Sequence, residues 1–163
     1  MEFKWVSPLG ISVALFLLQG ALWILVGALT PVLLNTRIDQ QGGLIISGRT
    51  DKVVFGGSPS ELLQNDPALA KLRTILVNII SGLLVAAGVL VFMLAWFALR
   101  KEEVWALAAL AMAGTVVLPF WLLVLWPYLR AGAPLALFDL PPFMWVPASL
   151  LIPATVLGRI GLR

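Results

Sequence analysis

The sequence contains neither cysteine nor histidine, and it has few charged residues. Without cysteine the chain can form no disulfide and no thiolate metal site, so cysteine usage does not identify its redox compartment. Without histidine it lacks the commonest general base, the commonest metal ligand and the usual haem ligand. These absences predict no metal site, no cofactor and no catalytic residue, and they argue against an enzyme.

Charged residues make up 12% of the 163 residues and hydrophobic residues 61%, whereas about a quarter of the residues in soluble domains are charged. This composition is typical of an integral membrane protein. The formal net charge of +3 is small, and no basic cluster with interleaved aromatic residues occurs. We therefore expect no binding to nucleic acid.

Four long stretches are free of Asp, Glu, Lys and Arg: Trp5–Thr36, Thr74–Leu99, Val104–Leu129 and Leu140–Gly158. A helix of about 20 apolar residues crosses roughly 30 Å of hydrocarbon. Because lipid offers no hydrogen bonds to the backbone, each stretch must be a helix. The sequence thus predicts an all-α integral membrane protein with four transmembrane helices in a bundle. The spans are expected at about residues 8–34, 74–99, 104–127 and 142–160.

The charged turn between the second and third stretches predicts the orientation. In Arg100–Glu103, two cations end one helix and two anions begin the next, an order that suits both helix dipoles and is a better explanation than a catalytic pair of carboxylates. By the positive-inside rule this turn is cytoplasmic, together with Lys4, Arg159 and Arg163. We therefore expect an inner (plasma) membrane protein with both termini in the cytoplasm. The basic residues of the long loop oppose this orientation in number, but long loops weigh little in the rule.

Aromatic residues gather at two levels along the expected spans, as in the aromatic belts at membrane–water interfaces. Near one face lie Trp5, Trp96 and Trp105, and near the other Trp126, Tyr128 and Trp145. These positions agree with the four expected spans.

Residues 35–73, which we call the cap, form the longest polar stretch and are expected outside the cytoplasm. Two apolar runs around the polar sequence Gly48–Asp51 predict a short β-hairpin. Ser58 and Glu61, with a proline directly after the serine, have the pattern of a helix capping box. Asp66–Pro67 repeats this helix-start pattern and leads into the second span. The cap is therefore expected to be a small folded unit that either shields the end of the bundle or contacts a partner.

No ionisable residue lies within any expected span, which argues against a proton pump or a proton-coupled transporter. Gln19, Thr115 and Ser149 are expected near mid-membrane, close to the carbonyls that Pro119 and Pro153 leave without a backbone donor. Two interpretations fit these polar residues. They form interhelical hydrogen bonds, which we favour, or they line a small polar pocket for a ligand.

Two further features provide candidate sites. Ala109 and Ala113 form a small-residue face on which another helix can pack closely. The loop after the third span is rich in aromatic residues and proline; it contains Arg130 and Asp139 and leads to Trp145. We expect it to lie in the membrane interface or against the cap, with a recognition groove as the alternative.

The chain has no phosphate loop, nucleophile elbow, zinc spacing or heptad pattern. We therefore expect a protein that acts by contact, as an accessory subunit or assembly partner of a larger membrane complex. Its partners would be membrane lipids and other subunits or further copies of itself. The alternative function is a binder or carrier of a lipophilic ligand or lipid. A lipid-modifying enzyme that uses Asp139 is a third possibility, which the lack of histidine disfavours.

Overall fold

The computed structural model describes residues 3–36 and 43–163, and within these ranges the chain is helical with no strand. Four helices are long and apolar enough to cross a membrane. They are α1 (Pro8–Thr36), α4 (Pro67–Met93, continued by the short turns η2, Leu94–Ala98, and η3, Leu99–Lys101), α5 (Val104–Arg130) and α6 (Pro142–Gly161). The predicted all-α, multi-pass membrane architecture with four spans is confirmed.

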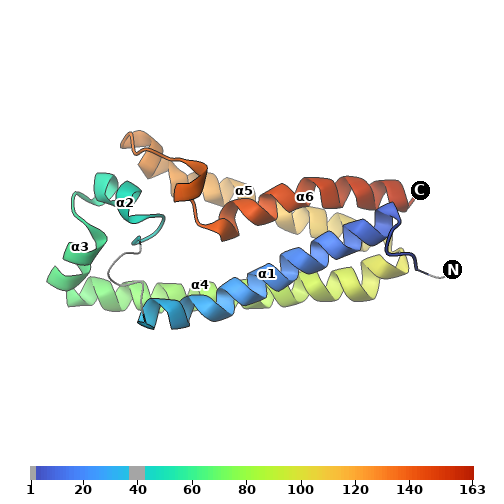
Figure 1. Cartoon of the computed structure of the whole chain (residues 1–163), viewed down its shortest axis with the longest axis horizontal. Coiled ribbons are helices and arrows are strands. Elements are labelled where there is room, and N and C mark those ends of the chain that lie inside the picture. Colours follow the sequence, from blue (N-terminus) through green and yellow to red (C-terminus); the bar gives the residue numbers. More distant parts are fainter. Residues whose placement is uncertain (1–2, 37–42) are drawn as a thin grey trace.

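Helix α1 is central and packs against both α4 and α6 (Figure 1). Glycines bring its backbone close to α4: a Cβ added to Gly20 would lie 2.8 Å from the Gly88 carbonyl oxygen. Toward α6, the buried Ser12 hydroxyl donates a hydrogen bond of 2.6 Å to the Ala154 carbonyl. Since lipid is as apolar as these side chains, close backbone approach and interhelical hydrogen bonds hold α1 between its neighbours.

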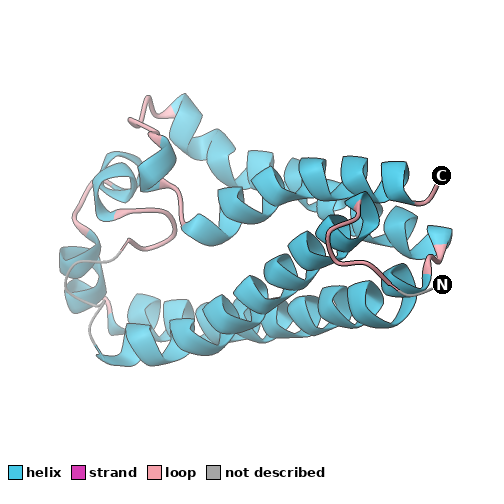
Figure 2. Ribbon diagram, turned by 45° about the vertical axis from the view of Figure 1, so that its right-hand side comes forward, coloured by secondary structure: helices cyan, strands magenta, loops and turns pink. Residues whose placement is uncertain are grey.

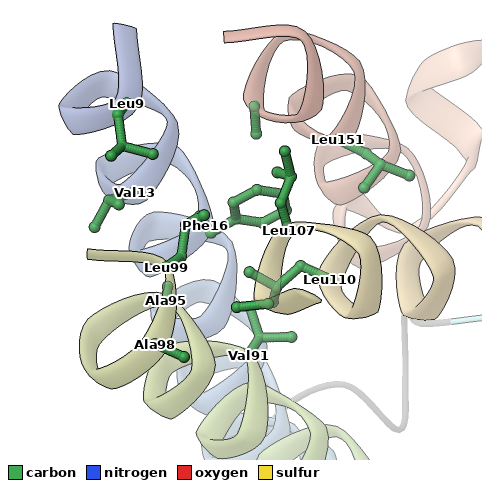
Figure 3. Close-up of a cluster of buried hydrophobic side chains, with 12 residues drawn as sticks. Leu9, Val13, Phe16, Val91, Ala95, Ala98, Leu99, Leu107, Leu110 and Leu151 are labelled. Carbon is green, nitrogen blue, oxygen red and sulfur yellow. The ribbon is translucent and has the colours of Figure 1, made fainter. Parts of the chain in front are cut away.

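The main hydrophobic core lies at the end of the bundle that holds both chain termini (Figure 2). All four long helices contribute to it, and Figure 3 shows Phe16 of α1 pointing toward Leu107 of α5. Its buried residues are Leu9, Val13, Phe16, Val91, Ala95, Ala98, Leu99, Ala106, Leu107, Leu110, Leu151 and Ala154. Toward the opposite end, the pair α1–α4 and the pair α5–α6 lie apart (Figures 1 and 2).

The charged connection between α4 and α5 is a tight turn, as predicted. The turn η3 ends α4 with two cations, and Glu103 precedes the first residue of α5. The Arg100 guanidinium lies 4.5 Å from the centroid of the Trp96 ring and also faces the rings of Phe3 and Trp5. These cation–π contacts attach the segment before α1 to the end of α4.

In the cap, a helix replaces the predicted β-hairpin. Helix α2 (Gly48–Phe55) begins after Ser47, whose hydroxyl accepts from the Thr50 N–H, and ends at Gly56, where φ is 75°. The prediction was wrong because Gly48–Asp51, taken for a hairpin turn, is the first turn of this helix. An N-cap serine and an acidic residue in the first turn favour a helix start. Residues 37–42 of the cap lie outside the described residues.

The rest of the cap confirms the predicted helix starts. In α3 (Pro59–Asn65), the Ser58 hydroxyl accepts from the Glu61 N–H at 3.3 Å, and the Glu61 carboxylate accepts from the Ser58 N–H at 3.0 Å. Hydrogen bonding of the Glu61 carboxylate by the Ser58 side chain and by the Ser58 backbone N–H lowers the pKa of this carboxyl group. Asp66 then accepts from two backbone N–H groups of α4, so that α4 begins inside the cap.

Candidate functional site

A cavity of about 230 Å³ is lined by residues of all four long helices. Its wall is formed by Gln19 and Trp23 of α1 and by side chains from the segments 80–87 of α4, 114–121 of α5 and 144–151 of α6. An apolar cavity of about 150 Å³ in a protein core accommodates a benzene molecule. This cavity is therefore large enough for part of an organic ligand.

Two residues that line the cavity each carry a buried polar atom without a hydrogen-bond partner. Gln19 is 3% exposed and its Oε1 accepts no hydrogen bond, while the Nε1–H of Trp23 donates none. The two residues are four positions apart on α1, so they lie one above the other on the same face of the helix. A buried polar group without a partner costs on the order of 1–3 kcal/mol. Gln19 and Trp23 thus each hold a buried polar atom whose hydrogen bond is unmet, beneath a cavity surface that is almost wholly apolar.

The cavity borders the lipid on the side of α4 and α5. Two of its wall residues on α4, Ile80 and Leu83, are 51% and 65% exposed, and Leu118 of α5 is exposed as well. In a transmembrane bundle these apolar side chains face hydrocarbon. A lipophilic molecule can therefore reach the cavity from the membrane without crossing water.

The structure does not bring together the three polar residues predicted at mid-membrane. Only Gln19 faces the cavity. The hydroxyls of Thr115 and Ser149 are exposed and donate, over 2.8 and 2.7 Å, to carbonyls of the preceding turn in their own helices. The predicted interhelical hydrogen bonds are wrong for these two residues, because a hydroxyl in a helix can bond its own backbone while facing lipid. Their neighbours Gly114 and Ala148 line the cavity instead.

The prolines in these helices also face outward. Pro119 and Pro153 are exposed, and both helices continue through them. A proline leaves unpaired the carbonyl four residues earlier, on its own side of the helix. Gln19, inside the bundle, therefore does not meet the freed carbonyls as predicted.

The candidate residues of the second loop form local structure near the cap. The exposed Arg130 guanidinium lies 5.1 Å from the centroid of the Trp126 ring. Asp139 accepts from the Ala136 N–H at 3.0 Å and closes the short turn η4 (Leu137–Asp139). Trp145 is half-buried in the first turn of α6. None of these residues forms part of the cavity wall.

A second buried polar cluster, which the sequence did not predict, joins the cap to α5. Asp51 is 0% and Tyr128 2% exposed, and the Tyr128 hydroxyl donates to Asp51 Oδ1 over 2.6 Å. Asp51 also accepts from the N–H groups of Ile45 and Ile46, at 3.0 and 3.3 Å. Tyr128 was predicted in an aromatic belt; it is buried instead, because its hydroxyl reaches this carboxyl group and its ring packs against Ile46.

Comparisons of this chain with family models, curated proteins and solved structures find no match. Two groups of buried polar residues stand out among the residues that the structure describes. In the first, the Tyr128 hydroxyl and the Asp51 carboxyl group are hydrogen-bonded to each other, so this contact holds the cap on α5 and leaves no free group for a ligand. The cavity adjoins lipid, and two of its lining residues, Gln19 and Trp23, each carry a buried polar atom without a partner. The cavity is therefore the candidate functional site.

Proposed function

We propose that the protein binds a lipophilic molecule within the membrane, in the cavity between α1, α4, α5 and α6. The observation that supports this proposal is an apolar cavity of about 230 Å³ that is lined by all four long helices, with Gln19 and Trp23 among its lining residues. Sites for small molecules are typically apolar hollows with a few polar groups that fix orientation. The exposed wall residues on α4 give the ligand a route from the lipid.

A matched pair of variants on α4 tests this function. Ala87 lines the cavity, whereas the adjacent Ala86 is exposed on the outside of the helix. Ala87→Leu places a larger side chain in the cavity and should lower ligand occupancy roughly tenfold, which corresponds to about 1.4 kcal/mol. Ala86→Leu should leave occupancy unchanged. The measurement is photolabelling in phosphatidylcholine vesicles by fatty probes that carry a diazirine, with the labelled residues mapped by mass spectrometry.

The pattern of labelled residues decides the result. Binding in the cavity concentrates label on the half-buried wall residues Leu84, Ala87, Val117 and Trp121. Label spread evenly over lipid-facing residues such as Leu122 and Leu123, and equal in both variants, would show that the probe only dissolves in the surrounding bilayer.

Contact with another membrane protein, as an accessory subunit or assembly partner, is the second candidate function. It is favoured by the small-residue face of α5, where Ala113 is exposed and Ala109 is half-buried. Such a face allows a helix of a partner or of a second copy to approach closely. Purification in mild detergent followed by mass spectrometry separates the two functions: a stoichiometric lipid supports ligand binding, and a stoichiometric polypeptide supports assembly.

We also propose that both termini face the cytoplasm of the plasma membrane, supported by the basic residues Arg100, Lys101 and Arg159 at the terminal end of the bundle. The absence of native cysteine makes a direct test specific. A cysteine at the exposed Lys52 position of the cap should react with an impermeant maleimide on intact cells. A cysteine at Arg163 should react only after lysis. The opposite pattern of labelling would invert the orientation.

A further inference from the structure

We infer that the molecule bound in the cavity is a bilayer lipid, which places the methyl end of one hydrocarbon chain in the cavity while its headgroup stays at the membrane surface. This inference rests on the proposed ligand-binding function and adds the chemical class and the orientation of the ligand. Three properties of the cavity lead to it: an apolar surface without charge, a position halfway along the spans, and an opening toward hydrocarbon.

The surface of the cavity favours hydrocarbon over a polar group. It is almost wholly apolar, and none of the described residues that line it carries a charge. Gln19 Oε1 and Trp23 Nε1 lie buried beneath this surface, out of reach of a bound molecule. A headgroup placed here would lose its hydration without gaining an opposite charge or a hydrogen bond to these atoms, which is unfavourable. The part of the ligand inside the cavity is therefore hydrocarbon.

The cavity lies at mid-depth in the membrane, where the lipid chains of the two leaflets end. Its wall segment 114–121 begins about 15 Å from one end of α5 and stops about 13 Å from the other, at 1.5 Å per residue. The wall segment 80–87 lies about 20 Å from either end of the span Pro67–Lys101. The hydrocarbon layer is about 30 Å thick, so its midplane is about 15 Å from either surface. A lipid whose headgroup stays at the surface therefore brings the methyl end of a chain to this depth.

The volume of the cavity fits a chain end and is too small for a helix of another protein. About 230 Å³ is roughly one and a half times the volume that accommodates benzene, so the cavity holds several carbon atoms of one chain. A helical segment of eight residues is about 12 Å long and at least 10 Å wide, and it needs several times this space. An empty cavity would leave its wall without van der Waals contacts on that side. A chain end restores these contacts.

The chain reaches the cavity between α4 and α5. Helix α5 packs against the turns η2 and η3, beside its connection to α4. Farther along, wall residues of both helices are exposed: Ile80 and Leu83 of α4 and Leu118 of α5. We call these three residues the rim. A chain that passes over the rim stays continuous with the bilayer, so the lipid does not have to leave its leaflet.

Two phosphatidylcholine probes test the inference, one with a diazirine at the methyl end of a chain and one with the diazirine next to the chain's carbonyl group. Each is mixed into phosphatidylcholine vesicles with the full-length protein. Val117 lines the cavity and is half-buried, whereas its neighbour Val116 is 60% exposed outside the wall. The methyl-end probe should label Val117 roughly threefold more than Val116, since the wall offers packing contacts that fluid lipid does not. The other probe should label little of either valine.

The remaining outcomes separate this inference from the proposed function. Label that follows exposure, with more on Val116 than on Val117, would overturn the inference. If a diazirine alkane without a headgroup still prefers Val117, lipophile binding holds and the ligand is a separate molecule; if the alkane has no such preference, the proposed function is refuted as well. A preference for Val117 by the probe with its diazirine next to the carbonyl would place the polar end inside and contradict the inference. Disulfide-linked dimers of Leu118→Cys in vesicles would show that a second copy covers the rim instead.

A matched pair of variants on α4 tests the route. Leu83 belongs to the rim, whereas Leu90 lies outside the cavity wall, and the two side chains are 65% and 64% exposed. Leu83→Trp narrows the opening, so the labelling of Val117 by the methyl-end probe should fall to the level of Val116 or below it. Leu90→Trp should keep the preference for Val117. The same preference in both variants would contradict entry between α4 and α5.

Discussion

Gly88→Leu is expected to separate α1 from α4 and to destabilise the whole bundle. A Cβ at Gly88 would lie 2.7 Å from the Gly20 carbonyl oxygen and 2.9 Å from the Ile24 nitrogen, and both atoms belong to the backbone of α1. Backbone atoms cannot rotate away, so the two helices must move apart and lose the packing that holds α1. Overpacking of this kind costs about 1–3 kcal/mol and sometimes more. A lower midpoint of thermal unfolding in mild detergent is the measurement.

Gly82→Leu is the matched control. Gly82 lies on the same helix, and a Cβ there would meet nothing within 4 Å. Leucine has a higher helix propensity than glycine at both positions, so the propensity term is the same in the two variants. Only the contact with α1 differs between them. Equal unfolding midpoints for Gly82→Leu and Gly88→Leu would mean that α1 and α4 do not approach as closely as the structure indicates.

The number of spans and most helix starts could be predicted from the sequence, because the physics behind them is local. A long run without charges must be helical in lipid, since the bilayer supplies no partner for its backbone. The capping boxes work in the same way: Ser58, Glu61 and Asp66 satisfy backbone groups within a few residues of their own positions. At Gly48–Asp51 the composition is that of a turn and predicted a hairpin, but the N-cap at Ser47 starts a helix there.

The faces of the spans could not be predicted, because helices that are apolar all round carry no periodic pattern to show which side is buried. Thr115 and Ser149 were expected to face the same pocket as Gln19, yet they face lipid at a similar depth. The glycines were the informative residues. Gly20 and Gly88 mark the contact between α1 and α4, whereas Ala113 is exposed, as a face for a helix of another chain would be.

Half of the candidate site could be found from the sequence. Gln19 was noticed because an amide in the membrane needs a partner. Trp23 could not be predicted, because its indole N–H becomes informative only when burial leaves it unpaired. Its position four residues after Gln19 was the available indication that the two share a helix face. The contact between Asp51 and Tyr128 joins residues far apart in the chain, and no local pattern predicts such a pair.

Asp51→Ala is expected to undock the cap from α5 while leaving the bundle assembled. The substitution leaves three buried donors without an acceptor: the Tyr128 hydroxyl and the N–H groups of Ile45 and Ile46. Each such group costs on the order of 1–3 kcal/mol, which exceeds what a short helix such as α2 can compensate. The main core lies at the other end of the bundle and does not depend on this contact. Hydrogen exchange of the amides in α2 should therefore become much faster, with little change in the exchange of α1.

Two further variants test whether the faster exchange of α2 in Asp51→Ala arises because the Asp51 carboxyl group is buried. Asp66→Ala also removes a carboxylate that accepts two backbone hydrogen bonds, but Asp66 is exposed and water can replace it, so α2 should keep its protection. Tyr128→Phe removes one donor together with its hydroxyl and leaves the other two bonds to Asp51 in place; its effect on α2 should lie between those of the two aspartate variants. If Asp51→Ala leaves the exchange of α2 as slow as in the wild type, the cap is held by its apolar contacts with Tyr128 and Ala133 and not by the buried carboxyl group.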